Sequence, residues 1–323
     1  MRRFNQIVTA VVATLCAMGT ASAQSFTGKT IRIIVPYAAG GTSDILARAL
    51  SNKVGESLGA TVVVDNKPGA GGVLGSDLVA KSAPDGTTLL LTDIGGLTSA
   101  PALGAKLPFD VAKDFAPITM IAYSPHLVVV NPALPAKTLA ELVAASKTKV
   151  GSYSAATSGA GTAPHLAAAL FAKLAGVEWV YVPYKGGAQA ITDVMAGHAQ
   201  VMFNGMLATY PAVKGNQLRL LAVSSEKRWP TLPAVPTIAE SGYPGFVTGS
   251  WQGLLAAGST PIDIVAKLNA EFAKALAIPE IRERLMAQGA EPRPMTSAQF
   301  AEFLRNDTAK WAQLAKETGI KLE

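Results

Sequence analysis

Short apolar runs alternate with segments of helical periodicity along most of this chain. Between the runs, apolar residues recur every three to four positions, which predicts amphipathic helices at residues 43–58, 74–82, 139–146, 164–175 and 188–196. The runs themselves are rich in β-branched residues and predict strands buried on both faces at residues 31–35, 61–64, 88–91, 127–130, 179–182, 200–203 and 218–223. This alternation indicates an α/β protein with a parallel sheet that helices cover on both faces.

The last part of the chain has a different pattern, because residues 262–277, 281–288 and 297–318 predict successive helices. Two segments resemble passages between lobes. Residues 122–126 interrupt an apolar stretch, and the glycine- and proline-containing residues 241–246 lead into an extended run over 247–257. If the chain crosses at both places, the lobes are interleaved: residues 24–123 and 247–323 form lobe 1, and residues 124–246 form lobe 2.

The N-terminus carries an export signal. Arg2 and Arg3 precede an apolar run over residues 7–18, and Ala21-Ser22-Ala23 ends it with small residues. This pattern predicts a secretory signal peptide, residues 1–23, with cleavage after Ala23. The single cysteine, Cys16, lies inside it. The mature chain is therefore expected to be exported, without disulfides, thiol chemistry or cysteine-bound metal.

The charge excludes a nucleic-acid partner. The formal net charge is +6, and two of the positive charges lie in the signal segment. The remaining lysines and arginines are scattered among acidic residues, whereas a nucleic-acid footprint needs a basic stripe or a known module. Such a mild excess can only steer small anions slightly.

Six loops, three in each lobe, are rich in glycine, hydroxyl and amide groups: five follow predicted strands, and the sixth, residues 157–162, precedes the predicted helix at 164–175. Ligands of open α/β sheets bind outside the carboxyl ends of the strands, so we expect these loops to meet in one cleft. The loop VPYAAGGTSD, residues 35–44, leads from a strand into a helix but lacks the lysine of a phosphate-binding loop. Structural roles remain open for each loop. The glycines can serve tight turns, Asp44 can complement the helix dipole, and Thr162 can be an ordinary N-cap.

Motifs for catalysis and cofactors are missing. Residues 69–75 contain G-x-G-x-x-L rather than a dinucleotide fingerprint, and neither G-x-S-x-G nor H-E-x-x-H occurs. His126, His165 and His198 lack metal-ligand spacing, and a structural role is favoured for His165. We therefore expect no cofactor, no metal and no catalytic residue.

Five segments carry a resemblance to a known family: residues 36–44, 65–72, 157–166, 182–187 and 232–242. Together they resemble the periplasmic solute receptors of tripartite tricarboxylate transporters, the Bug receptor family. The resemblance covers essentially the whole mature chain. Ala199-Gln200 departs from it, since the family usually has an aspartate near that strand start. It implies a two-lobed type II periplasmic binding protein (Venus flytrap) fold, and carboxylate ligands held by loop amides, hydroxyls and water.

The function expected on this basis is capture of a small carboxylate-bearing metabolite and its delivery to the integral membrane permease subunits of such a transporter. A ligand sensor for a two-component histidine kinase, or an exported hydrolase, remains an alternative, and the sequence does not identify the carboxylate. The backbone N–H groups of Gly40 and Gly41 are expected to hold one carboxylate. The full set of expected ligand contacts is Tyr37, Ala39, Gly40, Gly41, Thr42, Asp44, Gly71 and Thr92 in lobe 1, and Thr157, Gly161, Thr162, His165, Lys185, Gly186, Gly187, Ala188 and Asn204 in lobe 2.

Overall fold

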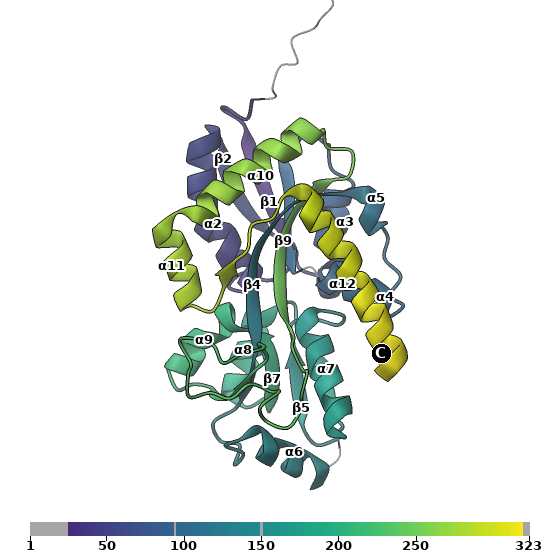
Figure 1. Cartoon of the computed structure of the whole chain (residues 1–323), viewed down its shortest axis with the longest axis vertical. Helices are drawn as coiled ribbons and strands as arrows, with labels where there is room; N and C mark the ends of the chain where they lie inside the picture. Colours follow the sequence, from purple (N-terminus) through teal and green to yellow (C-terminus); the bar gives the residue numbers. More distant parts are fainter. Residues whose placement is uncertain (1–24, 94, 149–150, 319–323) are drawn as a thin grey trace, which may run out of the picture.

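Two α/β lobes are stacked along the long axis of the molecule (Figure 1). The computed structural model describes residues 25–93, 95–148 and 151–318, so the predicted signal peptide lies outside the described residues. Two long strands, β4 (Phe115–Val130) and β9 (Gly249–Ala257), run from one lobe to the other through the centre of the molecule. This is the predicted two-lobed architecture with interleaved lobes.

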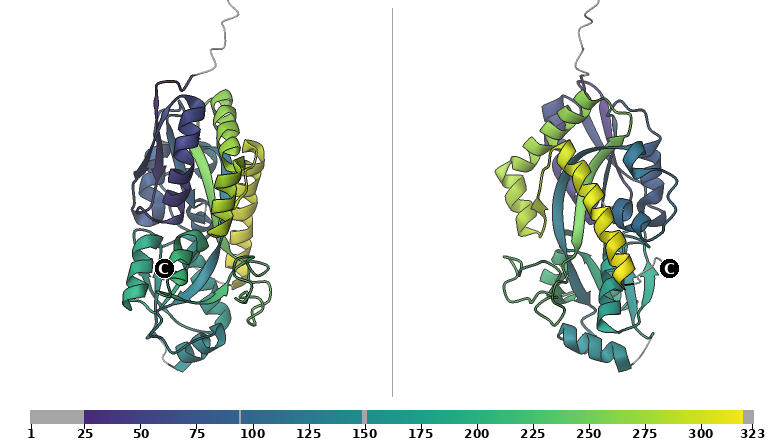
Figure 2. Two further views of the ribbon diagram at one scale, coloured as in Figure 1. Left: turned by 90° about the vertical axis from the view of Figure 1, so that its left-hand side faces the viewer. Right: turned by 45° about the vertical axis from the view of Figure 1, so that its right-hand side comes forward.

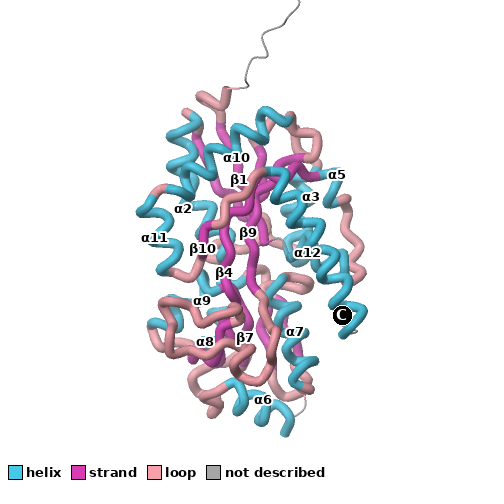
Figure 3. Tube along the Cα trace, viewed as in Figure 1, coloured by secondary structure: helices cyan, strands magenta, loops and turns pink. Residues whose placement is uncertain are grey.

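Each lobe contains a strand layer with helices packed on both faces (Figure 3). The upper lobe of Figure 1 takes its elements from both ends of the chain: β1 (Thr30–Val35), α2 (Thr42–Leu58), β2 (Thr61–Asn66), η1 (Ala70–Gly72), α3 (Val73–Ala80), β3 (Thr88–Asp93), α4 (Gly95–Ala102), α5 (Val111–Asp114), α10 (Ile262–Ala277), α11 (Pro279–Ala287), β10 (Glu291–Pro292) and α12 (Ser297–Thr318). The lower lobe is built from the middle of the chain: α6 (Leu139–Thr148), β5 (Ser154–Thr157), α7 (Ala163–Ala175), β6 (Val180–Pro183), α8 (Gly187–Ala196), β7 (Val201–Gly205), α9 (Met206–Lys214) and β8 (Arg219–Val223).

The strand order is β2-β1-β3-β9-β4-β7-β5-β6, and β8 and β10 also pair with β4. β1 pairs in parallel with β2 and β3, and β5 pairs in parallel with β6 and β7. β9, however, is antiparallel to β3 and β4, and β4 is antiparallel to β7. The prediction of a wholly parallel sheet is therefore wrong at the centre of the molecule. β4 carries the chain into the lower lobe and β9 brings it back, so the two strands run in opposite directions.

One predicted passage lies within β4, and the other lies just before β9. Residues 122–126, expected to interrupt an apolar stretch, lie inside the continuous strand β4, and residues 241–246 precede β9. The exact limits of the lobes at 123/124 and 246/247 stay predictions. α12 also spans the two lobes (Figure 2), since Leu314 and Ala315 near its end pack against the hydrophobic core of the lower lobe. Within the described residues, no helix is long and apolar enough to cross a membrane.

The helix that follows β1 shows how the sequence positions the cleft. α2 buries Leu46, Leu50, Val54 and Leu58, which are spaced at four-residue intervals and form one stripe against the sheet. Burying each such side chain stabilises the fold by about 1.5–3 kcal/mol. The helix ends at Leu58 and is followed by Gly59, whose φ of 63° is the left-handed conformation typical of a glycine cap. This packing fixes the start of α2 at the junction of the lobes.

Candidate ligand-binding cleft

A cavity of about 40 Å³ lies where the two lobes meet. In the upper lobe its walls are the β1–α2 loop and the end of β3, and in the lower lobe they are the starts of α7 and α8 and the end of β7. Strand β9, which we call the hinge strand because it connects the lobes, completes the wall. The lining residues are Tyr37, Gly41, Thr42, Ser43, Asp93, Ser158, Thr162, Pro164, Gly187, Asn204, Ser250 and Gln252. The cavity thus lies at the carboxyl ends of strands from both lobes, as the loop pattern predicts.

Three helices begin at this cavity, and their N-termini are not capped by side chains. The N-cap residues of α2, α7 and α8 are Gly41, Thr162 and Gly186, and none of them makes a side-chain capping hydrogen bond. The first N–H groups of a helix have no acceptor within the helix, and the helix dipole makes this end positive. The arrangement therefore presents backbone donors and partial positive charge to an anion in the cleft.

The β1–α2 loop is held in place by the buried carboxylate of Asp44, which pairs with the exposed side chain of Arg48. Asp44 accepts a hydrogen bond from the Gly40 N–H at 2.9 Å and pairs with Arg48 at 2.9 Å. Burial raises the pKa of Asp44, but hydrogen bonds from Arg48 and Gly40 lower it below its ordinary value overall. Asp44 does not line the cavity, and the Gly40 N–H is already used within the loop. The expectation that this N–H faces the cleft is therefore wrong for this conformation, whereas Gly41 and Thr42 do line the cavity.

A chain of hydrogen bonds crosses the cavity floor from α2 to the end of β3. The Ser43 hydroxyl donates to Gln252 Oε1 at 2.6 Å, and Gln252 Nε2 donates to Asp93 Oδ2 at 3.1 Å. The Gly95 N–H donates to Asp93 Oδ1 at 2.9 Å. Burial raises the pKa of Asp93 to about 6. Hydrogen bonds from Ser250, Gly95 and Gln252 partly offset this, and the negative charge of Asp307 adds to it.

The lower lobe contributes hydroxyl and amide groups. Asn204, at the end of β7, accepts a hydrogen bond from the Ser158 hydroxyl at 2.9 Å and donates from Nδ2 to Thr209 Oγ1 at 2.9 Å. The Thr162 hydroxyl donates to the Gly159 carbonyl oxygen at 2.8 Å. These bonds orient the wall opposite α2 without placing a cation in it.

The lobes touch across the cleft, so the conformation is closed. The Ala38 N–H of the upper lobe donates to the Lys185 carbonyl oxygen of the lower lobe at 2.9 Å. Gly186 lies so close that a β-carbon would be 3.0 Å from Ala38 N, and a β-carbon on Gly71 would collide with the Ala160 carbonyl oxygen. The small cavity volume follows from this closure.

The predicted contact residues divide into three groups. Those lining the cavity are Tyr37, Gly41, Thr42, Thr162, Gly187 and Asn204. Those at the contact between the lobes are Gly40, Gly71, Lys185, Gly186 and Ala188. The remaining ones lie outside the cavity lining: Ala39, Asp44, Thr92, Thr157, Gly161 and His165. In this last group Thr92 donates to the Tyr37 hydroxyl at 3.4 Å, and His165 Nδ1 accepts from the Gly161 N–H at 3.0 Å. Contact with ligand remains a prediction for all of them.

Sequence reasoning did not include six cavity residues: Ser43, Asp93, Ser158, Pro164, Ser250 and Gln252. Four of them lie in or beside the predicted loops. Ser250 and Gln252 lie two positions apart in β9, so their side chains point to the same face of an otherwise apolar strand. That polar pair is the signal that could have identified them.

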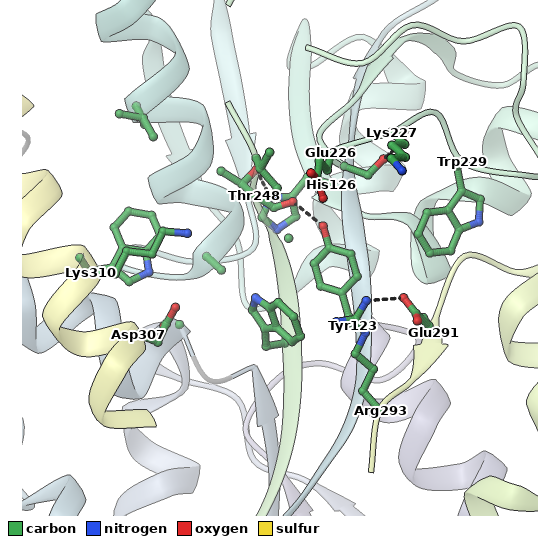
Figure 4. Close-up of a pocket in the computed structure, with 18 of the residues that line it drawn as sticks. Tyr123, His126, Glu226, Lys227, Trp229, Thr248, Glu291, Arg293, Asp307 and Lys310 are labelled. Atoms are coloured by element: carbon green, nitrogen blue, oxygen red, sulfur yellow. Dashed lines mark hydrogen bonds and ion pairs between the residues drawn. The ribbon is translucent and has the colours of Figure 1, made fainter. Parts of the chain in front are cut away.

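A larger cavity, of about 580 Å³, lies on the opposite face of β9 (Figure 4). Gly249 and Trp251 line it, whereas Ser250 and Gln252 line the cleft. Figure 4 shows Tyr123 and Arg293 on one side of this rear cavity, and Asp307 and Lys310 on α12 across from them. The Arg293 guanidinium lies over the rings of Tyr123 and Trp251, at 5.7 and 5.6 Å from their centroids. None of the predicted contact residues lines the rear cavity.

His126 on β4 contacts one residue of each cavity: Ser250, which lines the cleft, and Thr248, which lines the rear cavity. Its Nε2 is 3.2 Å from the Ser250 hydroxyl and its Nδ1 is 3.1 Å from Thr248 Oγ1. Burial lowers the pKa of His126 to about 3, so the imidazole is neutral at physiological pH. The part of the chain that the structure describes holds no cluster of three or more acidic, histidine or cysteine side chains suited to a metal ion.

The sequence of residues 46–320 matches the tripartite tricarboxylate transporter family receptor. The chain belongs to this family. The receptor is 36% identical over 328 residues to protein BugT of Bordetella pertussis, a comparison that covers 100% of this chain and 99% of BugT.

Solved structures similar to this receptor confirm its fold. The periplasmic binding protein BugD superimposes with a TM-score of 0.88 at 33% identity, covering 92% of this chain and 99% of BugD. The Rhodopseudomonas palustris protein Rpa4515 with adipate gives 0.88 at 33% identity, covering 91% and 98% of the two chains. MatC from the same organism with bound malate gives 0.86 at 32%, covering 89% and 99%. The receptor therefore has the two-lobed fold of periplasmic binding proteins. Its family and these structural relatives are binding proteins and not enzymes.

Proposed function

We propose that the receptor is exported to the periplasm, captures a small carboxylate-bearing metabolite in the cleft, and delivers it to the integral membrane permease subunits of a tripartite tricarboxylate-type transporter. The observation that carries this proposal is the convergence of three uncapped helix N-termini, those of α2, α7 and α8, on one cavity. Each favourable dipole contact with an anion is worth about 0.3–1 kcal/mol, and up to ~2 kcal/mol when partly buried.

The absence of a fixed cation suits a protein that must release its ligand. Among the described residues, neither a lysine nor an arginine lines the cleft cavity. A bidentate arginine would hold a carboxylate more tightly than neutral donors do. Because the donors come from both lobes, a bound carboxylate stabilises the closed conformation over an open one.

The class of ligand is supported by relatives of known structure. One similar protein was solved with adipate and another with malate, and both ligands are small dicarboxylates. The shared fold and the neutral donors at the cleft make a carboxylate the best-supported ligand class for this receptor.

Thermal shift measurements on the mature chain, residues 24–323, test the capture step. A panel of aliphatic, hydroxylated, amino and aromatic carboxylates is compared with the primary amides of the same acids. A ligand that binds only the folded protein stabilises it by RT ln(1 + [L]/Kd), about 2.7 kcal/mol at a hundredfold excess over Kd. We expect a shift with at least one acid and none with its amide. No shift with any carboxylate would contradict the proposal.

Delivery needs a separate measurement. Uptake of the radiolabelled acid that binds is compared in cells with the gene for the receptor and in cells without it. We expect uptake to depend on the receptor, and normal uptake without it would exclude the delivery step.

A further inference from the structure

Asp93 is a carboxylate inside a cleft proposed to bind carboxylates. It ends β3, its side chain is 6% exposed, and it lines the same 40 Å³ cavity as Gly41, Thr42 and Ser43 at the start of α2. A carboxylate ligand at α2 must therefore bind close to a second carboxyl group. Such a group would be expected to repel the ligand unless it has a role in recognition.

The partners of Asp93 leave its charge uncompensated. It accepts hydrogen bonds from the Gly95 N–H, Gln252 Nε2 and the Ser250 hydroxyl, which are all neutral donors. An ionised carboxylate has about four acceptor positions, so the three donors found among the described residues leave room for one more. The cleft cavity has no lysine or arginine among its described lining residues to supply it.

We propose that Asp93 selects ligands that carry a hydroxyl or ammonium group on the carbon next to the bound carboxylate. The inference rests on the proposed function and narrows its ligand class to 2-hydroxy and 2-amino acids. Asp93 and the residues that begin α2 line the same cavity, and Ser43 of α2 and Asp93 both hydrogen-bond Gln252. A carboxylate at the N-terminus of α2 thus places the substituent of its neighbouring carbon within reach of Asp93, which accepts the hydrogen bond.

A plain carboxylate brings the same negative charge close to Asp93 but lacks this donor, so no hydrogen bond from the ligand offsets the repulsion. Two adjacent ionised carboxylates repel each other strongly, so binding of a plain acid requires Asp93 to take up a proton. The titratable groups that act on Asp93 add no positive charge. Asp307 on α12 is acidic and faces Lys310, and Tyr37 is a phenol. His126 contacts Asp93 only through Ser250, and its imidazole is neutral. Affinity for plain acids should therefore fall as the pH rises above about 6.

Isothermal titration calorimetry on the mature receptor tests this selection with matched ligands. The two series are succinate, malate and aspartate, and glutarate, 2-hydroxyglutarate and glutamate. Each is measured at pH 5 and pH 8 with the wild type and with Asp93→Asn. Asp263→Asn, an exposed position on α10, is the control. We expect the wild type at pH 8 to bind the hydroxyl- or ammonium-bearing member of at least one series about tenfold or more tightly than the plain acid.

The plain acid should gain affinity toward pH 5 by up to about tenfold per pH unit, since one proton is taken up. Asp93→Asn should lose both the preference and the pH dependence, and Asp263→Asn should keep them. A wild type without preference, or an Asp93→Asn variant that keeps it, would overturn the role of Asp93 while leaving the proposed function intact. If none of the six acids binds at either pH, the selection of 2-hydroxy and 2-amino acids is overturned. The proposed function itself fails only if the wider carboxylate panel also gives no shift. Asp93→Ser serves as the second variant if Asp93→Asn does not fold, as judged by circular dichroism.

Discussion

Gly40 and Gly41 are neighbours in the chain but differ in backbone conformation. Gly40 has a φ of 81°, in the left-handed region that favours glycine, and a β-carbon there would lie 3.4 Å from Ala188 Cβ. Gly41 has an extended backbone with a φ of −79°, and a β-carbon would meet only the Ala38 carbonyl oxygen at 3.5 Å, an ordinary contact. The turn therefore requires Gly40, whereas only the ligand would require Gly41.

Gly41→Val should separate binding from folding. We expect carboxylate affinity to fall more than tenfold, beyond about 1.4 kcal/mol, because the new side chain occupies the approach to the α2 N-terminus. The melting temperature should stay close to that of the wild type. Gly40→Ala is the matched variant and should lose about 1 kcal/mol of stability, because alanine is strained at positive φ. Calorimetric affinity and thermal unfolding are measured on both. A destabilised Gly41→Val that still binds tightly would contradict the assignment of this glycine to the ligand.

The raised pKa of Asp93 also predicts a pH dependence in the absence of ligand. Its pKa of about 6 in the folded state lies above the ordinary value of 3.8, so the folded state holds the proton more tightly. Stability from this group is therefore fully present below about pH 4 and is lost as the pH rises to 6. Asp93→Asn should match the wild type near pH 4 and exceed it at pH 8, by on the order of 1–3 kcal/mol from ~1.4 kcal/mol per pKa unit.

Urea unfolding of both proteins from pH 4 to pH 8 gives that difference. Asp307, whose pKa is also raised by burial, is present in both proteins, and its effect on the Asp93 charge is part of the difference that is measured. A stability difference that does not change with pH would show that Asp93 titrates normally.

At the scale of elements, periodic amphipathic segments were predictable from sequence. α10 and α12 have the predicted limits, and the start of β3 and most of β1 agree with their apolar runs. β5 was not predicted, because Ser154–Thr157 reads SAAT and lacks the β-branched run on which the prediction depends. The direction of β4 and β9 was also beyond reach, since periodicity reports burial and not orientation.

The part of the candidate site that loops at strand ends form was predictable from sequence, whereas the part that β9 forms was not. Loops at strand ends meet by the geometry of an α/β sheet, so Gly41, Thr162 and Asn204 could be placed together from their positions alone. Ser250 and Gln252 come from a strand about 200 residues further along the chain than Gly41. Their presence at the cleft depends on β9 pairing between β3 and β4, a tertiary contact without a local sequence signal.

Strand β9 separates the cleft from the rear cavity. We therefore expect a side chain that fills the rear cavity to change the affinity of the cleft for its ligand. A rotation about β4 and β9 that opens the cleft narrows the space behind them, so a bulky side chain in the rear cavity should favour the closed conformation. Val247 lines that cavity and is 40% exposed. We expect Val247→Trp to bind carboxylate severalfold more tightly than the wild type, as measured by calorimetry.

Val63→Trp is the control for Val247→Trp, because Val63 is 44% exposed on β2 at the edge of the sheet, away from the hinge. It should leave affinity unchanged. Equal affinities of the Val247→Trp variant and the wild type would show that the rear cavity does not limit opening.

At the scale of the whole molecule, the proposed ligand site spans both lobes, so we expect ligand binding and closure to form one equilibrium. The lobes meet through backbone groups, including the Ala38 N–H and the Lys185 carbonyl oxygen, and through glycines that allow close approach. Three helix N-termini complete the site only when the lobes are together. A change that blocks contact between the lobes should therefore reduce affinity even where it does not touch the ligand.

Gly71→Ala is the variant that tests this coupling. Its β-carbon would collide with the Ala160 carbonyl oxygen of the other lobe, and Gly71 has a φ of 64°. Gly28→Ala is the matched control, because Gly28 has a φ of 74° and nothing within 4 Å of the added carbon. Both variants should lose a similar, small amount of stability, about 1 kcal/mol. Only Gly71→Ala should bind carboxylate at least tenfold more weakly and keep a larger radius of gyration in small-angle X-ray scattering with saturating ligand. Normal compaction and affinity in Gly71→Ala would mean that the contact at Gly71 is not needed for closure.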